Sequence, residues 1–454
     1  MSFRLTEGFC FGGVLSKTVP LELRDEVTPW IPEKEQNDRY WMQQALLASM
    51  NSVGISNPNP TVGCVIVRNG VEIARGSTLA FGGKHAERVA IESISDKSLL
   101  QGAYAYVTLE PCSHFGKQPP CVQALIDSGI TRCVVALGDP NPLVNWNGLR
   151  RLKDEGIEVC LGLYAPEAMA WNYNFIMSQL LNRPIFAGKW AQTLDGHLAD
   201  DECTSKWISG SSSRSYTHWL RQKYDAILVG AGTVLRDIPQ LSVRSCSQPI
   251  NRQPMKIVFD PKGRLLTCPE HIQKQLSENF LAPSIPLIIF TQEKFLLSAH
   301  SLWAESLVQS ESILFLTFKE EDYFWEKIVD YLQSETVKKH FGKPLQSILV
   351  EGGPKLLTQL LAANLLDICH VFIAPILVGG VENRIMNPLS LSLRETAFTS
   401  SKYVGGKLSL ASQYKLIAQN RLGNDICMEF IPQKFAEELL RRNIFNEFSH
   451  QIVN

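Results

Sequence analysis

Short apolar runs alternate with helical stretches in two successive series, and this alternation limits the fold more than any other feature. In the first series, the apolar runs lie at 62–67, 71–74, 103–109, 133–137 and 157–161, and the helical stretches around 86–95, 120–129 and 147–155. In the second, strands are expected near 185–191, 225–230, 255–259, 286–290, 312–317, 346–351 and 368–374, and helices at 211–223, 321–334 and 354–364. Strands that alternate with helices predict α/β sheets. We therefore expect two α/β domains.

The boundary between the two series is expected at Asn182-Arg183-Pro184, after a helical segment over 171–181. A chain of 454 residues is too long for one ordinary domain, which agrees with this division. We expect four parts: an N-terminal extension at 1–36, a first domain at 37–181, a second domain at 182–432 and a C-terminal helical tail at 433–454. The stretch from about 268 to 345 carries charge clusters and is interpreted as an expansion of the second domain.

Composition excludes several classes of protein. Apolar residues make up 45% and charged residues 20%, as in soluble globular proteins, and the net charge of −1 provides no global field for a nucleic-acid backbone. No apolar stretch has the length of a membrane span, and we expect a cytoplasmic protein. Eleven cysteines without dense spacing do not form a secreted disulfide framework. A cysteine pair near a histidine then favours a metal site.

One such constellation is His85-Ala86-Glu87, followed by Cys112 and Cys121. One histidine and two thiolates give three zinc ligands and leave the fourth tetrahedral position for water, as a catalytic zinc site requires. Glu87, two residues after the histidine, is placed to move protons between water, a ring nitrogen and leaving ammonia. The pattern predicts deamination, because it follows the zinc-deaminase signature.

The spacing of the cysteines departs from that signature. Eight residues, rather than two, separate Cys112 from Cys121, although each cysteine follows a proline. His114 lies between them and is an alternative ligand, but we expect it to pack in the loop or to face substrate.

The first half resembles the deaminase half of the bifunctional riboflavin-biosynthesis deaminase/reductase family. The resemblance rests on 57–67, on His85-Ala86-Glu87, on 106–114 with 119–121, and on Asp139-Pro140-Asn141-Pro142. In that family the eight-residue spacing is the normal form. The resemblance implies a cytidine-deaminase-like three-layer α/β/α domain that deaminates a diaminopyrimidinone ribosylamino 5′-phosphate and holds one Zn²⁺ per chain.

The second half contains two strand–glycine–helix turns, at 225–237 and at 349–354. Backbone N–H groups at such helix starts can hold phosphate, so the pair suggests a nucleotide site. A full Gly-x-Gly-x-x-Gly with a following acid is missing, and the ordinary dinucleotide-binding fold is not supported. Taken alone, each turn is equally compatible with nucleotide binding and with a purely structural role.

As a set, 189–196, 205–210 and the two turns are similar to the reductase half of the same family, and the resemblance then covers about 39 to 430. It implies a dihydrofolate-reductase-like α/β domain and NADPH as hydride donor. The implied cofactor positions are Ala191, Trp207, Thr233, Asp237, Gly353, Pro354, Lys355, Leu356, Leu357 and Thr358. The implied substrate contacts are Ser205, Arg221, Leu241, Arg244 and Glu351. Arg221 and Arg244 suit a 5′-phosphate, because guanidinium groups bind phosphate bidentately.

Several positions depart from the family pattern: Asn57, Lys117-Gln118, Asn145-Trp146-Asn147-Gly148, His197 and Ile238. They leave open a paralogue that deaminates another pyrimidine or pterin-like nucleotide, with an altered or inactive reductase domain. A nucleic-acid deaminase and a non-catalytic zinc scaffold are further alternatives, disfavoured by the near-neutral charge and by Glu87. We expect a small-molecule substrate, no nucleic-acid or membrane partner, and a homo-oligomer.

Overall fold

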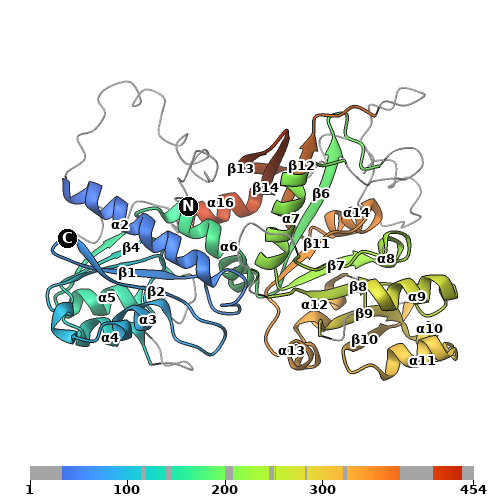
Figure 1. The fold of residues 1–454 in the computed structure, drawn as a ribbon, viewed down its shortest axis with the longest axis horizontal. Coiled ribbons are helices and arrows are strands. Elements are labelled where there is room, and N and C mark those ends of the chain that lie inside the picture. The colour runs from blue at the N-terminus through green and yellow to red at the C-terminus, as the bar shows by residue number, and fades with distance from the viewer. Residues whose placement is uncertain are drawn as a thin grey trace. The chain divides into compact units, whose positions relative to one another are not determined.

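A computed structural model gives the fold and describes residues 33–113, 119–139, 146–199, 208–244, 250, 252–281, 284–320, 325–378 and 413–441. These residues fall into two compact units that divide between Asn182 and Arg183 (Figure 1). The first unit ends at Asn182 and also takes in the chain from Lys434, which includes most of helix α16 (Gln433–Arg441). The second unit runs from Arg183 to Gln433. No described helix is long and apolar enough to cross a membrane.

The first unit is built on a five-stranded sheet with the order β2-β1-β3-β4-β5. Its strands are β1 (Gly63–Arg68), β2 (Val71–Ser77), β3 (Tyr104–Val107), β4 (Arg132–Val135) and β5 (Glu158–Leu161). β1 is antiparallel to β2 and β3, whereas β3, β4 and β5 are parallel. The turn between β1 and β2 places Asn69 and Gly70 at φ 51° and 73°, as a two-residue hairpin requires.

Helices cover both faces of this sheet, which gives the expected three layers (Figure 1). They are α2 (Glu33–Ser49), α3 (Ala86–Ser93), α4 (Cys121–Asp127), α5 (Asn147–Asp154) and α6 (Ala165–Leu181), with short 3₁₀ turns η2 (Met50–Ser52) and η3 (Lys97–Leu100). Two glycines allow the helices to approach: a Cβ on Gly63 would lie 1.9 Å from the carbonyl oxygen of Ala45 in α2, and one on Gly76 would lie 2.2 Å from that of Ala86 in α3. Gly76 is paired with Cys64, the residue after Gly63, so the two glycines face opposite sides.

The second unit contains a nine-stranded sheet with the order β10-β9-β8-β7-β11-β6-β12-β14-β13. Strands from β10 to β12 run parallel, and β14 and β13 continue the sheet antiparallel. The strands are β6 (Ile185–Thr193), β7 (Ala226–Gly230), β8 (Met255–Phe259), β9 (Leu287–Gln292), β10 (Ile313–Phe318), β11 (Ser347–Val350), β12 (Leu366–Ala374), β13 (Tyr414–Leu422) and β14 (Asp425–Pro432). All seven predicted strands of this half are present.

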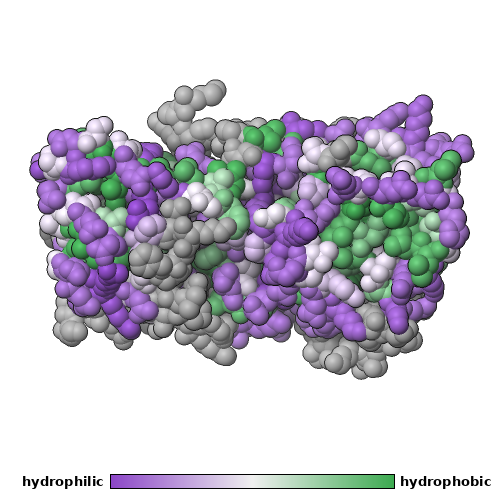
Figure 2. Space-filling view, turned by 90° about the horizontal axis from the view of Figure 1, so that it is seen from below, coloured by the Kyte–Doolittle hydropathy of each residue, from purple (hydrophilic) through white to green (hydrophobic). Residues whose placement is uncertain are grey.

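The helices of the second unit are α7 (Ser211–Lys223), α8 (Ala231–Asp237), α9 (Glu270–Asn279), α10 (Glu293–Leu297), α11 (Leu302–Gln309), α12 (Trp325–Gln333), α13 (Glu335–Phe341) and α14 (Pro354–Ala362). Its main core includes Phe186, Ile257 and Ile348, all fully buried. A smaller apolar cluster lies between α11 and the neighbouring loops, around Leu266, Ala304 and Leu307. Figure 2 shows apolar residues gathered on the lower side of this unit, where α11 and β10 lie, and Leu302 of α11 is 85% exposed.

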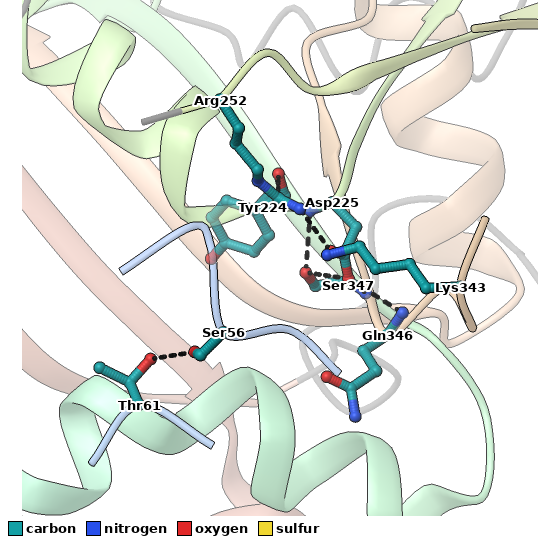
Figure 3. Close-up of polar contacts among 8 residues, drawn as sticks. All are labelled: Ser56, Thr61, Tyr224, Asp225, Arg252, Lys343, Gln346 and Ser347. Carbon is teal, nitrogen blue, oxygen red and sulfur yellow. Dashed lines mark hydrogen bonds and ion pairs between the residues drawn. The ribbon is translucent and has the colours of Figure 1, made fainter. Parts of the chain in front are cut away.

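A buried aspartate joins the amino ends of β7 and β11. Oδ2 of Asp225 accepts hydrogen bonds from the backbone N–H groups of Gln346 at 3.0 Å and Ser347 at 3.2 Å (Figure 3). Its Oδ1 pairs with Nη1 of Arg252 at 2.9 Å and with Nζ of Lys343 at 3.5 Å. β11 therefore enters the sheet between β6 and β7 in a fixed register, with the carboxyl ends of β7 and β11 side by side at the opposite edge.

Candidate active sites

Three side chains from separate segments of the first unit converge on one point. His85 is the N-cap residue of α3, Cys112 follows β3, and Cys121 is the first residue of α4. Nδ1 of His85 lies 3.6 Å from Sγ of Cys112 and 3.4 Å from Sγ of Cys121. All three ligand atoms lie within 4.8 Å of one another. One imidazole nitrogen and two sulfurs at this spacing fit a tetrahedral zinc ion with one open position.

A pocket of about 150 Å³ opens beside this cluster. His85, Cys112 and Glu87 contribute to its wall, together with Asn59, Pro60, Val62, Thr78, Leu109, Glu110, Asp139 and Phe175. Glu87 is 3% exposed and lies in the first turn of α3, two residues after His85. The structure therefore brings the four residues predicted for the deaminase together, with a buried carboxyl group beside the three candidate ligands.

The electrostatics of the cluster favour a charged thiol and a proton-exchanging carboxyl group. A hydrogen bond with Cys121 lowers the pKa of Cys112 to about 4 against the effect of burial, and His85 adds to the lowering. The backbone N–H of Cys121 also donates to Sγ of Cys112 over 3.3 Å. Burial raises the pKa of Glu87 to about 7, and the charge of Cys112 adds to the rise. A carboxyl group that titrates near neutrality suits general acid–base work.

Glu110 is a pocket residue that sequence analysis did not single out as functional. Its Oε2 accepts a hydrogen bond from the backbone N–H of Asp139 at 3.1 Å, and its Oε1 accepts one from Gly148 at 3.0 Å. The carboxylate thus joins the end of the β4 loop to the first turn of α5, and it is 4% exposed. The position directly before Pro111-Cys112 was the only available signal.

The substituted loop lies partly outside the described residues, which exclude 140–145 and also His114, Lys117 and Gln118. Trp146 is described: it is the N-cap of α5, has a φ of 67°, and packs against Gly138, where a Cβ would lie 2.2 Å from the indole ring. Trp146 is not among the residues that line the pocket.

In the second unit, the two glycine turns stand next to each other. Gly230 precedes α8 and Gly353 precedes α14, and the strands before them, β7 and β11, are parallel neighbours. A Cβ on Gly353 would lie 3.8 Å from Oγ1 of Thr233. Pro354 is near the start of α14, where its missing N–H costs no hydrogen bond. Two helix starts with little side-chain cover fit the phosphate groups of a dinucleotide.

Three predicted substrate residues meet on one side of these turns. Nε and Nη2 of Arg221 donate to the two carboxylate oxygens of Glu351 at 2.6 and 2.9 Å, and Nη1 donates to the carbonyl oxygen of Ser242 at 3.0 Å. Leu241 precedes Ser242 and is buried with a φ of 49°. Although burial alone would raise the pKa of Glu351, Arg221 holds it below its usual value.

The remaining predicted reductase residues are more dispersed. Ala191 lies on β6 opposite Phe372 of β12, whereas Asp237 and Arg244 are exposed. Leu356, Leu357 and Thr358 are buried in α14, and Lys355 is exposed. Ser205 and Trp207 lie outside the described residues.

Lys189 and His218 are charged or polar groups near Arg221 that sequence analysis did not select. Burial lowers the pKa of Lys189, and the charge of Glu351 opposes that shift. Nδ1 of His218 lies 3.0 Å from the carbonyl oxygen of Ser242, which also accepts from Arg221. The signal for Lys189 was its place at the start of the 189–196 motif, whereas His218 had none.

Family models match both halves of the chain. Residues 35–137 match the zinc-binding region of cytidine and deoxycytidylate deaminases, and residues 185–410 match the RibD C-terminal domain. Together with the two sites, these matches define the class: a deaminase domain followed by a reductase domain with a dihydrofolate-reductase-like fold.

Curated relatives and solved structures match along most of the chain. Riboflavin biosynthesis protein RibD of Aquifex aeolicus is 37% identical over 75% of this chain and 88% of its own length, and that of Escherichia coli K12 is 34% identical over 87% and 99%. A diaminohydroxyphosphoribosylaminopyrimidine deaminase/5-amino-6-(5-phosphoribosylamino)uracil reductase from Thermotoga maritima is 32% identical with a TM-score of 0.69, over 87% of this chain and 99% of its own. The chain belongs to the RibD family and is a bifunctional deaminase/reductase of riboflavin biosynthesis. The comparisons do not favour the paralogue with an altered or inactive reductase.

Proposed function

We propose that the first domain deaminates 2,5-diamino-6-ribosylamino-4(3H)-pyrimidinone 5′-phosphate with one zinc ion per chain. His85, Cys112 and Cys121 would hold the zinc, which supplies the Lewis acidity that makes water a nucleophile near neutral pH. The observation that carries this assignment is the convergence of the three ligand atoms within 4.8 Å beside the buried Glu87.

Glu87 is the proton carrier in this proposal. Its carboxyl group takes one proton from the attacking water and gives it to the ring nitrogen. It then takes the second proton from the added hydroxyl group and gives it to the departing amine, which leaves as ammonia. The pKa of about 7 supports this role, because such a group is neither firmly protonated nor firmly charged at neutral pH. The pocket wall also includes Asn59 and Asp139, which can offer hydrogen bonds to the pyrimidine.

The second domain is proposed to reduce the ribosyl group of 5-amino-6-ribosylaminouracil 5′-phosphate to ribityl. NADPH supplies the hydride, and Thr233 with the turn from Gly353 to Thr358 would hold it, together with Ala191, Trp207 and Asp237. Arg221 and Arg244 would bind the 5′-phosphate, and Ser205, Leu241 and Glu351 would complete the substrate contacts. In support, the guanidinium group of Arg221 donates directly to Glu351, another proposed substrate residue, through two hydrogen bonds of 2.6 and 2.9 Å.

We also propose the domain limits 37–181 for the deaminase and 182–432 for the reductase, with an extension at 1–36 and a tail at 433–454. The spans of the two family models and the division of the chain at Asn182 support the limit between the two domains.

The decisive experiment supplies the purified protein with the diaminopyrimidinone substrate and NADPH, and follows ammonia and NADPH absorbance as separate signals. We expect both signals, with NADPH oxidation only after ammonia has formed. Ammonia without oxidation would reject the reductase assignment, and oxidation without ammonia would reject the order of the two steps. If zinc-loaded protein gave neither signal, the proposed substrate would be rejected.

A further inference from the structure

Helix α7 carries Arg221 and His218, and polar contacts hold it to the β12–β14–β13 edge of the sheet at three levels. The contacts come from Gly210, Ser213, Tyr216 and Tyr224, whereas Arg221 contacts Glu351 and Ser242. None of these groups is among the residues proposed above to bind substrate or cofactor. Together they fix the position and rotation of α7 on the sheet.

The first level is the amino end of the helix. Oδ2 of Asp425, the first residue of β14, accepts hydrogen bonds from the backbone N–H of Gly210 at 2.7 Å and from Oγ of Ser213 at 2.6 Å. This carboxylate, which comes from β14, caps the amino end of the helix. Its negative charge also interacts favourably with the positive end of the helix dipole. Asp425 is 4% exposed and Ser213 is fully buried.

The second and third levels share Glu429, four residues further along β14. The hydroxyl of Tyr216 donates to Oε1 of Glu429 at 3.0 Å, and Nδ1 of His370 on β12 lies 3.4 Å from the same oxygen. Nε2 of His370 in turn lies 2.8 Å from the hydroxyl of Tyr224, directly after α7. Glu429, His370 and Tyr224 are all buried.

These anchors bracket Arg221. It lies five residues after Tyr216 and three before Tyr224. An α-helix advances about 1.5 Å and turns about 100° per residue, so a slide or rotation of α7 by one residue would remove the Arg221 fork from Glu351. Contacts at the start, middle and end of the helix oppose both movements.

We propose that Asp425 and Glu429 are positioning residues for the reductase, which act through α7 on the binding of the substrate 5′-phosphate by Arg221. The inference rests on the proposed function, because it needs Arg221 to be a phosphate ligand. It adds that the affinity of Arg221 for the phosphate depends on two acids of one strand, β14, which hold α7 through other residues of the helix.

The test uses the full-length protein with Asp425→Ala, and Asp425→Asn as the matched variant that keeps an acceptor oxygen. Steady-state KM and kcat are measured for the deaminated substrate and for NADPH. We expect Asp425→Ala to raise the substrate KM about 10-fold, because displacing a binding group by about 1 Å can cost up to about 100-fold. KM for NADPH, and ammonia release by the same preparation, should be unchanged. Asp425→Asn should restore most of the substrate affinity.

A purely structural role gives a different result, because a smaller folded fraction lowers apparent kcat and leaves KM unchanged. That outcome would overturn the proposal. Tyr216→Phe removes a single hydroxyl, and it serves if Asp425→Ala does not fold; we expect its substrate KM to rise about 3-fold, in line with one lost hydrogen bond. An unchanged KM in Tyr216→Phe would also overturn the proposal.

Two further experiments, with Arg221→Lys and with a substrate that lacks the phosphate, distinguish the positioning role of Asp425 from phosphate binding by Arg221. If Arg221→Lys leaves the KM for the phosphorylated substrate unchanged, the proposed function fails. If Arg221→Lys raises that KM but Asp425→Ala does not, only the positioning role fails. With the dephosphorylated substrate, Asp425→Ala and the wild type should have equal KM values, and a persisting difference would contradict action through the phosphate.

Discussion

Glu87 and Glu110 are two buried carboxyl groups in the wall of one pocket, and their hydrogen-bond partners separate their roles. Burial raises the pKa of both to about 7. Glu110 accepts from the backbone N–H groups of Asp139 and Gly148, which commits both oxygens to the protein. Glu87 lies beside the candidate zinc ligands. A group whose oxygens are committed holds structure, whereas the group beside the ligands is placed to exchange protons.

Glu87→Gln should keep zinc and abolish ammonia release. The amide has the size of the carboxyl group but cannot carry a proton between water and ammonia, and such a loss costs about 100- to 10,000-fold in rate. Zinc content and kcat for ammonia are measured together, with Glu92→Gln on the exposed side of α3 as the control. Ammonia release at the wild-type rate would remove Glu87 from the mechanism.

Glu110→Gln should raise the KM of the deaminase while zinc content stays constant. A glutamine offers one acceptor oxygen, so one of the two backbone N–H groups would face an NH₂ group, at a cost of about 1–3 kcal/mol for a buried unsatisfied donor. The ends of the loop between Asp139 and Gly148 would then separate. NADPH oxidation with the deaminated substrate is the internal control. Equal KM values for variant and wild type would show that the hydrogen bonds of Glu110 to Asp139 and Gly148 do not shape the deaminase pocket.

At the scale of elements, the strands and the first helix turns were predictable because apolar runs and prolines mark them locally. The predicted helix 211–223 is present as α7, and the strands near 255–259 and 368–374 as β8 and β12. Helix α6 starts six residues before the expected 171, at Ala165, directly after Tyr164, which has a left-handed conformation. Strand β13 was not expected, because its exposed and buried residues alternate imperfectly across a register shift.

The same distinction between local and non-local sequence signals applies to the functional residues. The convergence of His85, Cys112 and Cys121 near Glu87 was predictable because these residues lie in short motifs. Glu110, Asp425 and Glu429 were not, because each acts through a partner far away in sequence, such as Gly210, which is 215 residues from Asp425. Strand order decides these pairs, and no local pattern carries it.

Asp225→Asn should destabilise the reductase selectively. The variant removes the buried negative charge with which Arg252 and Lys343 pair, and breaking such an arrangement costs about 3–5 kcal/mol. NADPH oxidation should then be lost at lower temperature than in the wild type. Glu335→Gln, which removes the exposed pair with Lys338, is the control and should have little effect. If Asp225→Asn and the wild type were inactivated at the same temperature, the contacts of Asp225 would not contribute substantially to the stability of β7 and β11.

At the scale of the whole molecule, each activity has its own sheet and its own residues. The candidate zinc ligands lie between His85 and Cys121, and the described reductase residues lie between Ala191 and Thr358, on the other side of the division at Asn182. Removal of zinc with a chelator should therefore stop ammonia release and leave NADPH oxidation intact when the deaminated substrate is supplied. With the diamino substrate, both signals should stop together, because the second step then lacks its substrate. Added zinc should restore both. A parallel loss of NADPH oxidation with the deaminated substrate would mean that zinc supports the reductase as well, and the two units would not be functionally separable.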